Sequence, residues 1–305
     1  MPFAEPVILP EPHRVLVRAG AFELEAGVWD GGERAHVLLL HGLGGNSVTW
    51  HGVGPTLAET LGARVLALDL PGFGCSHPRG KPVSFGVLVE VVLAALREQG
   101  PEARWTLAGN SLGGALALRV ACLAPERVAR VSVGAMALPL AWGRSARGFA
   151  AFAGSVVLAT PGVGRRLVAR YARTTGVPGV VDEPVRELFG DPARLDPLLR
   201  ERLLAVSSSR FAWADEAARA YEQTLRSLGV ELLLPSGVAR SIEQVRVPVQ
   251  AIHGTRDPLY PASAWSELQH RRPDWRYDEL EGTGHVPQLE SPAAYTSLLL
   301  RWLGA

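Results

Sequence analysis

Hydrophobic and polar side chains follow two different periods along this chain of 305 residues. Residues 13–20 and 22–29 alternate apolar and polar positions, which is typical of half-buried strands, and we expect these two strands to pair antiparallel. Short, continuous apolar runs predict buried strands at 36–42, 64–72, 105–111, 128–135 and 247–254, and a further strand-like stretch lies at 275–282. Continuous apolar runs of this kind belong to a sheet that is covered on both faces.

Helical patterns lie between several of these strands. Apolar residues recur with a helical period in residues 84–100, which end at a glycine, and in residues 112–128, where Pro125 ends the helix. Strand followed by helix, repeated along the chain, predicts an α/β fold with a mostly parallel sheet.

The alternation of strands and helices stops between residues 136 and 240. Helical patterns occur there at 164–174, 196–206 and 214–229, without a convincing buried strand, and the earlier pattern resumes near residue 247. An all-helical insertion into an α/β core predicts a cap or lid. We therefore expect a core made of residues 1–135 and 241–305, with a helical cap at 136–240.

Composition excludes several classes of function. The formal net charge is +1, which argues against the basic surface that nucleic acid requires. The first residues lack the pattern of a signal peptide, the apolar stretches are too short to span a membrane, and Cys75 and Cys122 cannot form a disulfide framework. We expect a cytoplasmic protein. No Cys/His cluster has the spacing of a metal site, so we expect neither metal nor cofactor.

The most informative short motif surrounds Ser111. Gly109 and Gly113 flank it in a G-x-S-x-G pattern, a buried strand precedes it and a helix follows at once. This context is typical of a nucleophile elbow, which presents a serine hydroxyl at the carboxyl edge of the sheet beside a helix N-terminus. Taken alone the pattern is a weak signal, because glycine and serine are common in ordinary turns.

Four other stretches strengthen this interpretation. Together with the elbow, the stretches are LLLHGLGGNSVTW, ALDLPGFGCS, AGNSLGGALAL, IHGTRDPLYP and GTGHVPQLESP, in that order. In this combination the chain resembles the α/β-hydrolase superfamily, specifically its capped esterase and C–C hydrolase branch. The resemblance covers residues 1–135 and 241–305 and implies an eight-stranded, mostly parallel sheet.

The resemblance also implies the catalytic residues. Ser111 corresponds to the nucleophile, Asp257 to the acid and His285 to the base, in the order typical of the family. The chemistry makes the same demand, because a serine hydroxyl needs a base to take its proton and imidazole, with a pKa near ~6.5, suits that task. For the oxyanion hole the resemblance indicates the backbone N–H groups of Leu112 and Leu43, with Gly44 as a near alternative to Leu43.

Each of these residues also has a structural interpretation. Asp257 could be an ordinary turn former and Ser111 an ordinary turn serine, although the five stretches together favour catalysis. His41 and His253 end strands in HG pairs, and we expect them to shape loops. Glu290 is expected to begin the last helix and to lie outside the triad.

The class of substrate is a hypothesis at this stage. C–C hydrolases of this fold usually carry a Trp shortly after the catalytic histidine, and this chain has HVPQLE instead. We favour an esterase that forms an acyl-enzyme on small to medium hydrophobic substrates. A C–C hydrolase or a cofactor-free perhydrolase is the alternative, and a non-catalytic ligand-binding protein is a further one. The aromatic residues expected to line a substrate pocket in the cap are Trp142, Phe149, Phe152, Phe211 and Trp213. The oligomeric state stays open.

Overall fold

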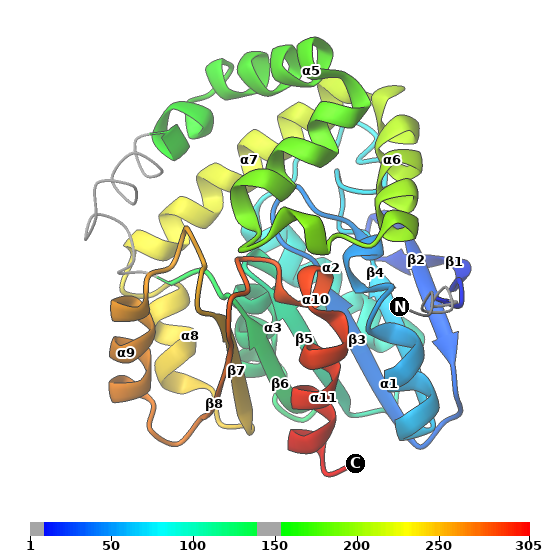
Figure 1. The fold of residues 1–305 in the computed structure, drawn as a ribbon, viewed down its shortest axis with the longest axis vertical. Helices are drawn as coiled ribbons and strands as arrows, with labels where there is room; N and C mark the ends of the chain where they lie inside the picture. Colours follow the sequence, from blue (N-terminus) through cyan, green and yellow to red (C-terminus); the bar gives the residue numbers. More distant parts are fainter. Residues whose placement is uncertain (1–8, 139–153) are drawn as a thin grey trace, which may run out of the picture.

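A computed structural model describes residues 9–138 and 154–305. Its centre is one eight-stranded sheet with the order β1-β2-β4-β3-β5-β6-β7-β8 (Figure 1). The strands are β1 (His13–Ala19), β2 (Phe22–Asp30), β3 (Ala35–Leu40), β4 (Ala63–Leu68), β5 (Trp105–Asn110), β6 (Val128–Gly134), β7 (Val249–Gly254) and β8 (Arg276–Leu280). All eight lie where the sequence pattern predicts a strand.

The pairing of the strands confirms the predicted fold class. β2 runs antiparallel to both β1 and β4, and every other neighbouring pair is parallel. In a parallel sheet the carboxyl ends of neighbouring strands lie at one edge, where α/β proteins place their ligands. β5, β7 and β8, after which the three predicted triad residues follow, therefore end at the same edge.

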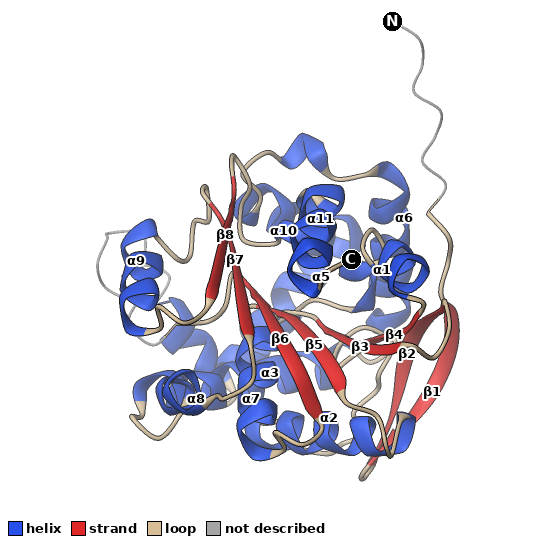
Figure 2. Cartoon of the chain, turned by 90° about the horizontal axis from the view of Figure 1, so that it is seen from below, coloured by secondary structure: helices blue, strands red, loops and turns tan. Residues whose placement is uncertain are grey.

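Both faces of the sheet are buried. On β3, Leu38 and Leu40 belong to one apolar cluster, while Val37 and Leu39 belong to another on the opposite face. Side chains alternate across a strand, so a continuous apolar run supplies both clusters. The helices that cover the two faces (Figure 2) are α1 (Gly54–Leu61) and α11 (Pro292–Leu303) on one side, with α2 (Phe85–Gln99), α3 (Leu112–Leu123) and α8 (Val238–Gln244) on the other. Helices α9 (Ala262–Arg271) and α10 (Pro287–Glu290) follow β7 and β8, respectively.

The helix limits have local causes. At the start of α2, the Ser84 hydroxyl accepts a hydrogen bond from the N–H of Val87 at 3.3 Å, which satisfies one of the free donors of the first turn. The helix α3 ends at Leu123, shortly before Pro125, which cannot continue a helix. Both limits agree with the predicted helices.

In the described part of the segment predicted to be a cap, the long elements are helices and no strand occurs. It contains α5 (Val163–Leu188), α6 (Pro197–Phe211) and α7 (Ala214–Leu233), which lie together beyond one end of the strands in Figure 1. α5 is two helical pieces joined at Gly176, whose φ of 66° only glycine adopts readily. The predicted boundary at residue 240 falls inside α8, and the division into core and cap stays a prediction.

No helix in residues 9–138 or 154–305 combines the length and the apolar character that crossing a membrane requires.

Candidate active site

Ser111 lies at the sharp turn between β5 and α3. Its φ of 52° and ψ of −113° are unusual for a residue with a side chain, and such strain persists only where the surroundings enforce it. The Ser111 N–H donates to the carbonyl of Gly134 at 2.9 Å, and its own carbonyl accepts from Ala115 at 3.2 Å. These two bonds hold the turn between β6 and the first turn of α3.

The two glycines of the elbow are required by close contacts of the backbone. A Cβ atom on Gly109 would lie 2.2 Å from the carbonyl oxygen of Gly113. A Cβ atom on Gly113 would lie 2.2 Å from the carbonyl oxygen of Leu40, at the end of the neighbouring strand β3. Any side chain at either position would push α3 away from the sheet, so the turn that presents Ser111 depends on both glycines.

His285 and Asp257 form a direct pair. His285 Nδ1 lies 2.9 Å from Asp257 Oδ2, and both side chains are buried. Asp257 follows β7 and His285 follows β8, so the pair lies at the carboxyl edge of the sheet as predicted. The ring of Tyr260 lies against the imidazole, with the ring centroids 5.5 Å apart.

The environment of Asp257 keeps its carboxylate charged. Burial by itself raises the pKa of this carboxyl, but the imidazole of His285 and the N–H groups of Tyr260 and Leu259 outweigh it and hold the pKa below its usual value. Those two N–H groups bond to Oδ1 at 3.0 and 2.8 Å, which leaves Oδ2 for the histidine. An ionised Asp257 fixes the proton of His285 on Nδ1 and leaves Nε2 as the basic nitrogen.

The nucleophile and the histidine are linked through Asn110. Among the described residues, no hydrogen bond joins the Ser111 hydroxyl directly to His285. The Asn110 amide, one residue before the nucleophile, donates to the carbonyl of His285 at 3.0 Å and to that of Gly134 at 3.1 Å. The structure therefore pairs His285 with Asp257 directly and ties the backbone of His285 to the start of the elbow.

The loop after β3 lies beside the nucleophile, as an oxyanion hole requires. A Cβ atom on Gly42 would lie 3.4 Å from Ser111 Cβ. The Gly42 carbonyl accepts from Gly45 N–H at 3.0 Å and contacts His41 Nδ1 at 2.7 Å, inside the loop. Because N–H and C=O point in opposite directions across a trans peptide, the N–H of Leu43 points out of the loop.

Neither predicted oxyanion donor is engaged elsewhere in the described part of the chain. No other described residue accepts a hydrogen bond from the N–H of Leu43 or of Leu112, and Leu112 is the first residue of α3, whose N–H has no partner within the helix. Gly44, the alternative donor, has a φ of 78° and lies against Tyr221 of α7. With respect to residues 9–138 and 154–305, the N–H groups of Leu43 and Leu112 are thus free to bind a negatively charged oxygen.

The other two histidines near the sheet edge have structural surroundings. His41 Nε2 accepts from Leu70 N–H at 3.0 Å while Nδ1 contacts the Gly42 carbonyl, so one neutral tautomer satisfies both contacts. Burial lowers the pKa of both His41 and His253. His253 stacks on Trp265 with ring centroids 4.8 Å apart. These contacts agree with the expectation that both histidines shape loops.

One sequence expectation is wrong. Glu290 does not begin the last helix, because α11 begins at Pro292 and Glu290 ends the short helix α10. Its carboxylate is fully buried and accepts three backbone hydrogen bonds, one of them from Gly284, next to the histidine. The GHVPQLE stretch held the residues of this contact, but nothing in it identified the distant partners of the carboxylate.

The aromatic residues expected to line a cap pocket are only partly described. Trp142, Phe149 and Phe152 lie outside the described residues. Trp213 packs on His77 of the core, with ring centroids 4.9 Å apart, so it joins the cap region to the core. Phe211 is half-buried at the end of α6.

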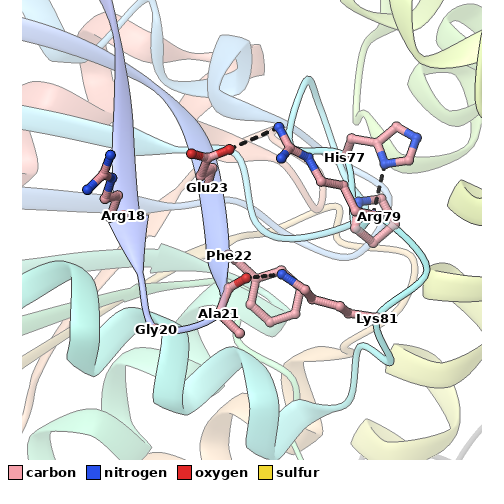
Figure 3. A pocket seen from close by; sticks show the side chains of 9 residues that line it. Arg18, Gly20, Ala21, Phe22, Glu23, His77, Arg79 and Lys81 are labelled. Atoms are coloured by element: carbon pink, nitrogen blue, oxygen red, sulfur yellow. Dashed lines mark hydrogen bonds and ion pairs between the residues drawn. The ribbon is translucent and has the colours of Figure 1, made fainter.

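A surface pocket of about 290 Å³ lies away from the candidate site, at the β1–β2 edge of the sheet (Figure 3). It is lined by Arg18, Gly20, Ala21, Phe22, Glu23, His77, Pro78, Arg79 and Lys81. An ion pair of 2.9 Å joins Arg79 to Glu23 across it.

In the described part of the chain, no group of three or more His, Cys, Asp or Glu side chains has an arrangement that could hold a metal ion.

Comparison with known proteins places this chain in a family. The model of the alpha/beta hydrolase fold family matches residues 35–292, and the chain belongs to that family. The protein is a hydrolase, since the family is that of the alpha/beta hydrolases and its relatives include esterases.

Individual relatives of this chain include an esterase and an acetyltransferase component. The chain is 28% identical over 277 residues to a pimeloyl-[acyl-carrier protein] methyl ester esterase of Nitrosomonas europaea, covering 87% of this chain and 94% of the relative. It is 29% identical to the dihydrolipoyllysine-residue acetyltransferase component of the acetoin cleaving system of Pseudomonas putida, covering 88% of this chain but only 63% of that protein.

A similar solved structure is 2-hydroxy-6-oxo-6-phenylhexa-2,4-dienoate hydrolase from Rhodococcus sp. strain RHA1. It is 26% identical, with a TM-score of 0.72, and the alignment covers 97% of this chain and 99% of that one. The relatives thus include both esterases and a hydrolase of a dienoate.

Proposed function

We propose that the protein is a serine hydrolase that cleaves carboxylic esters of small to medium hydrophobic substrates through an acyl-enzyme. Ser111 is the nucleophile, His285 the general base and Asp257 the acid that orients it. The observation that carries this proposal is the 2.9 Å contact between His285 Nδ1 and Asp257 Oδ2, at the sheet edge where Ser111 occupies a strained turn. Residues 136–240 form the cap over this site in the proposal.

Acylation of Ser111 is the first half of the proposed reaction. His285 Nε2 takes the proton of the Ser111 hydroxyl while Oγ bonds to the ester carbonyl carbon, and the carbonyl electron pair moves onto its oxygen. The intermediate then re-forms the carbonyl and expels the alkoxide, which takes the proton from Nε2. Water repeats these steps on the acyl-enzyme, releasing the carboxylic acid and restoring the serine.

Two backbone N–H groups stabilise the oxyanion in this mechanism. Leu112 N–H begins α3, where the helix dipole adds positive potential, and Leu43 N–H comes from the loop beside the nucleophile. A single donor of this kind is worth about a hundredfold to a thousandfold in rate. The combination of a nucleophile, a base and two free donors favours acyl transfer over simple ligand binding.

The test is a burst experiment with p-nitrophenyl butyrate on the wild type and on Ser111→Ala, with mass spectrometry after exposure to a fluorophosphonate. We expect turnover in the wild type, its loss in Ser111→Ala, and the adduct on Ser111. The matched control is Ser297→Ala on α11, where an exposed hydroxyl bonds only to its own helix, at 2.9 Å from the Ala293 carbonyl.

Other outcomes separate the alternatives. An adduct on Ser111 without ester turnover would favour a C–C hydrolase, and turnover of peroxide with a carboxylic acid would favour a perhydrolase. If the wild type shows no adduct and no turnover, the proposal is contradicted and a non-catalytic binding protein is favoured. A series of p-nitrophenyl esters tests the substrate class, because equal and poor turnover of acetate and long acyl chains would contradict a hydrophobic pocket.

One observation supports C–C cleavage of an anionic substrate as a second candidate. In the described part of the chain, Arg210 of α6 has no acidic partner within ion-pair distance, and its guanidinium lies over the ring of Phe73, with Cζ 5.4 Å from the ring centroid. Burial lowers the pKa of Arg210 to about 10, so it still carries its charge at neutral pH. Phe73 contacts His41 in the loop after β3, with ring centroids 5.7 Å apart.

Arg210, which has no ion-pair partner among the described residues, suits a substrate with a carboxylate, such as the dienoate in the name of the Rhodococcus relative. Arg210→Met, which keeps an unbranched side chain of similar shape, tests this. If the second candidate holds, the variant loses activity on 2-hydroxy-6-oxo-6-phenylhexa-2,4-dienoate and on monomethyl adipate, but keeps it on methyl hexanoate. Equal effects on monomethyl adipate and methyl hexanoate would reject a carboxylate at this position.

A further inference from the structure

Glu290 carries a buried carboxylate that the proposed reaction does not use. Its side chain has no exposed surface. Oε2 accepts from the N–H of Gly284 at 2.7 Å and of Gly190 at 3.1 Å, and Oε1 accepts from Asp191 at 3.0 Å. Three charge-assisted hydrogen bonds offset the cost of burying the charge. Arg194 lies 3.9 Å from Oε1 at the rim.

The three donors belong to two segments that are far apart in the chain. Gly284 is in the histidine loop, which we define as residues 282–285. Gly190 and Asp191 are in the segment that follows α5, residues 188–191, which we call the cap segment because it lies within the predicted cap. Figure 1 shows the end of α5 next to α10, on which Glu290 lies. The carboxylate therefore joins the cap region to the loop of the candidate base.

The histidine loop and the cap segment also contact each other directly through their backbones. The N–H of His285 donates to the carbonyl of Leu188 at 2.7 Å. A Cβ atom on Gly284 would lie 2.1 Å from that same carbonyl oxygen, and one on Gly190 would lie 2.3 Å from the carbonyl oxygen of Gly282. The two segments leave no space for a side chain between them, so movement of one displaces the other.

These contacts fix His285 from several directions. Its N–H bonds to the cap segment, its carbonyl bonds to Asn110 beside the nucleophile, and its ring bonds to Asp257. Glu290 holds the residue just before it. If the Glu290 bonds are lost, the bond from His285 N–H to the Leu188 carbonyl must hold the cap segment to the histidine loop with less support, and the imidazole shifts relative to Ser111.

We propose that Glu290 is a positioning residue, whose carboxylate locks the cap segment to the histidine loop and thereby holds His285 in line with Ser111. This inference rests on the proposed function. Positional errors of about 1 Å at a reacting group cost about a hundredfold in rate, so a lock of this kind affects the chemical step more than substrate binding. The placement of the cap then contributes to catalysis through the base and not only through the substrate pocket.

The first test compares Glu290→Gln with Glu281→Gln, which removes a charge from an exposed residue just before the same loop. Kinetics on p-nitrophenyl butyrate are normalised to active sites titrated with the fluorophosphonate. In Glu290→Gln, one N–H donor faces the amide NH₂, and we expect kcat per titrated site to fall about tenfold to a hundredfold, the larger figure being the cost of a misplacement of about 1 Å. KM should stay within about twofold, because the substrate contacts are unchanged. Glu281→Gln should match the wild type.

A second variant reaches the same contact from the opposite side. Gly190→Ala places a Cβ against the Gly282 carbonyl while Glu290 is intact, and it should reproduce the loss of kcat per site. Its control is Gly229→Ala on α7, where an added Cβ meets no atom within 4 Å. Thermal unfolding and amide exchange accompany the kinetics, and Glu290→Gln should lose protection at Gly284, Gly190 and Asp191 together.

The outcomes separate this inference from the proposed function. If Glu290→Gln keeps wild-type kcat per titrated site, or loses only thermal stability, the positioning role is overturned while the proposed function stands. If the wild type neither reacts with the fluorophosphonate nor hydrolyses the ester, the proposed function fails, and the inference fails with it. Loss of kcat per site in both Glu290→Gln and Gly190→Ala, but in neither control, supports the inference.

Discussion

The substitution Asp257→Asn tests the proposed pairing of acid and base most directly. The side chain keeps its shape and loses its charge. In the native site, Oδ1 accepts the N–H groups of Leu259 and Tyr260 at 2.8 and 3.0 Å, while Oδ2 faces His285 Nδ1 at 2.9 Å. In the variant, the amide oxygen must take the place of Oδ1, because only an acceptor satisfies those two N–H donors. The amide NH₂ group then faces the histidine.

That orientation reverses the tautomer of His285. Facing an NH₂ donor, Nδ1 must accept a hydrogen bond, so the proton of the neutral ring moves to Nε2. Nε2 then cannot take the proton of the Ser111 hydroxyl. In enzymes with this triad the same change lowers kcat by about 10⁴, which corresponds to about 5.4 kcal/mol of activation free energy.

The assay is kcat for p-nitrophenyl butyrate at neutral pH, with folding followed by circular dichroism. The matched control is Asp278→Asn on β8, a buried aspartate that bonds to Arg276 at 2.8 Å and to Gln250 at 2.9 Å, apart from His285. The control should lose about 1–3 kcal/mol of stability and keep kcat within about twofold. A folded Asp257→Asn with kcat within about tenfold of the wild type would refute the reasoning.

Three further predictions concern stability. Gly113→Ala places a Cβ 2.2 Å from the Leu40 carbonyl oxygen, so it should lower the free energy of unfolding by about 1–3 kcal/mol and abolish ester turnover. Gly229→Ala, where an added Cβ meets no atom within 4 Å, should change neither. Urea unfolding and ester kinetics measure the two effects. Asp196→Ala removes the N-cap of α6 and should cost about 1 kcal/mol in urea unfolding without changing kcat; an unchanged unfolding midpoint would contradict the cap. The pKa of Asp257 is depressed in the folded protein, so its stabilising contribution is present at neutral pH and is lost as the pH falls below the ordinary pKa of about 3.9. On acidification, the wild type should therefore lose more free energy of unfolding than Asp257→Asn. An equal loss in both proteins would contradict the shift.

The fold was predictable because its strands carry a strong local signal. The runs that form β3 to β7 are apolar on both faces, and only a sheet covered on both sides buries them. The sequence was less informative for α5, where the helical pattern predicted only residues 164–174. The structure continues to Leu188 across Gly176 and past Pro178, because packing against α6 and α7 stabilises a bent helical segment that local propensity disfavours.

Some residues of the candidate site could be identified from the sequence and others could not. Ser111, Asp257 and His285 lie in short motifs at strand ends, so local sequence could identify them. Asn110 and Glu290 bond to residues that are distant in the chain: Glu290 bonds to Gly190, 100 residues away. A single sequence gives no signal for such a pair, since the meeting of the two segments is decided by the packing of the whole fold.

The order of the strands has a consequence for synthesis of the protein. Asn110 and His285 are hydrogen-bonded in the folded protein but lie 175 residues apart in the chain. A ribosome that adds about 5–20 residues per second needs about 9–35 s to make that interval. During this time the growing chain contains Ser111 without its proposed base, His285. If His285 is the base, as we propose, a nascent chain lacks hydrolase activity until its last strand and the loop after it have been made.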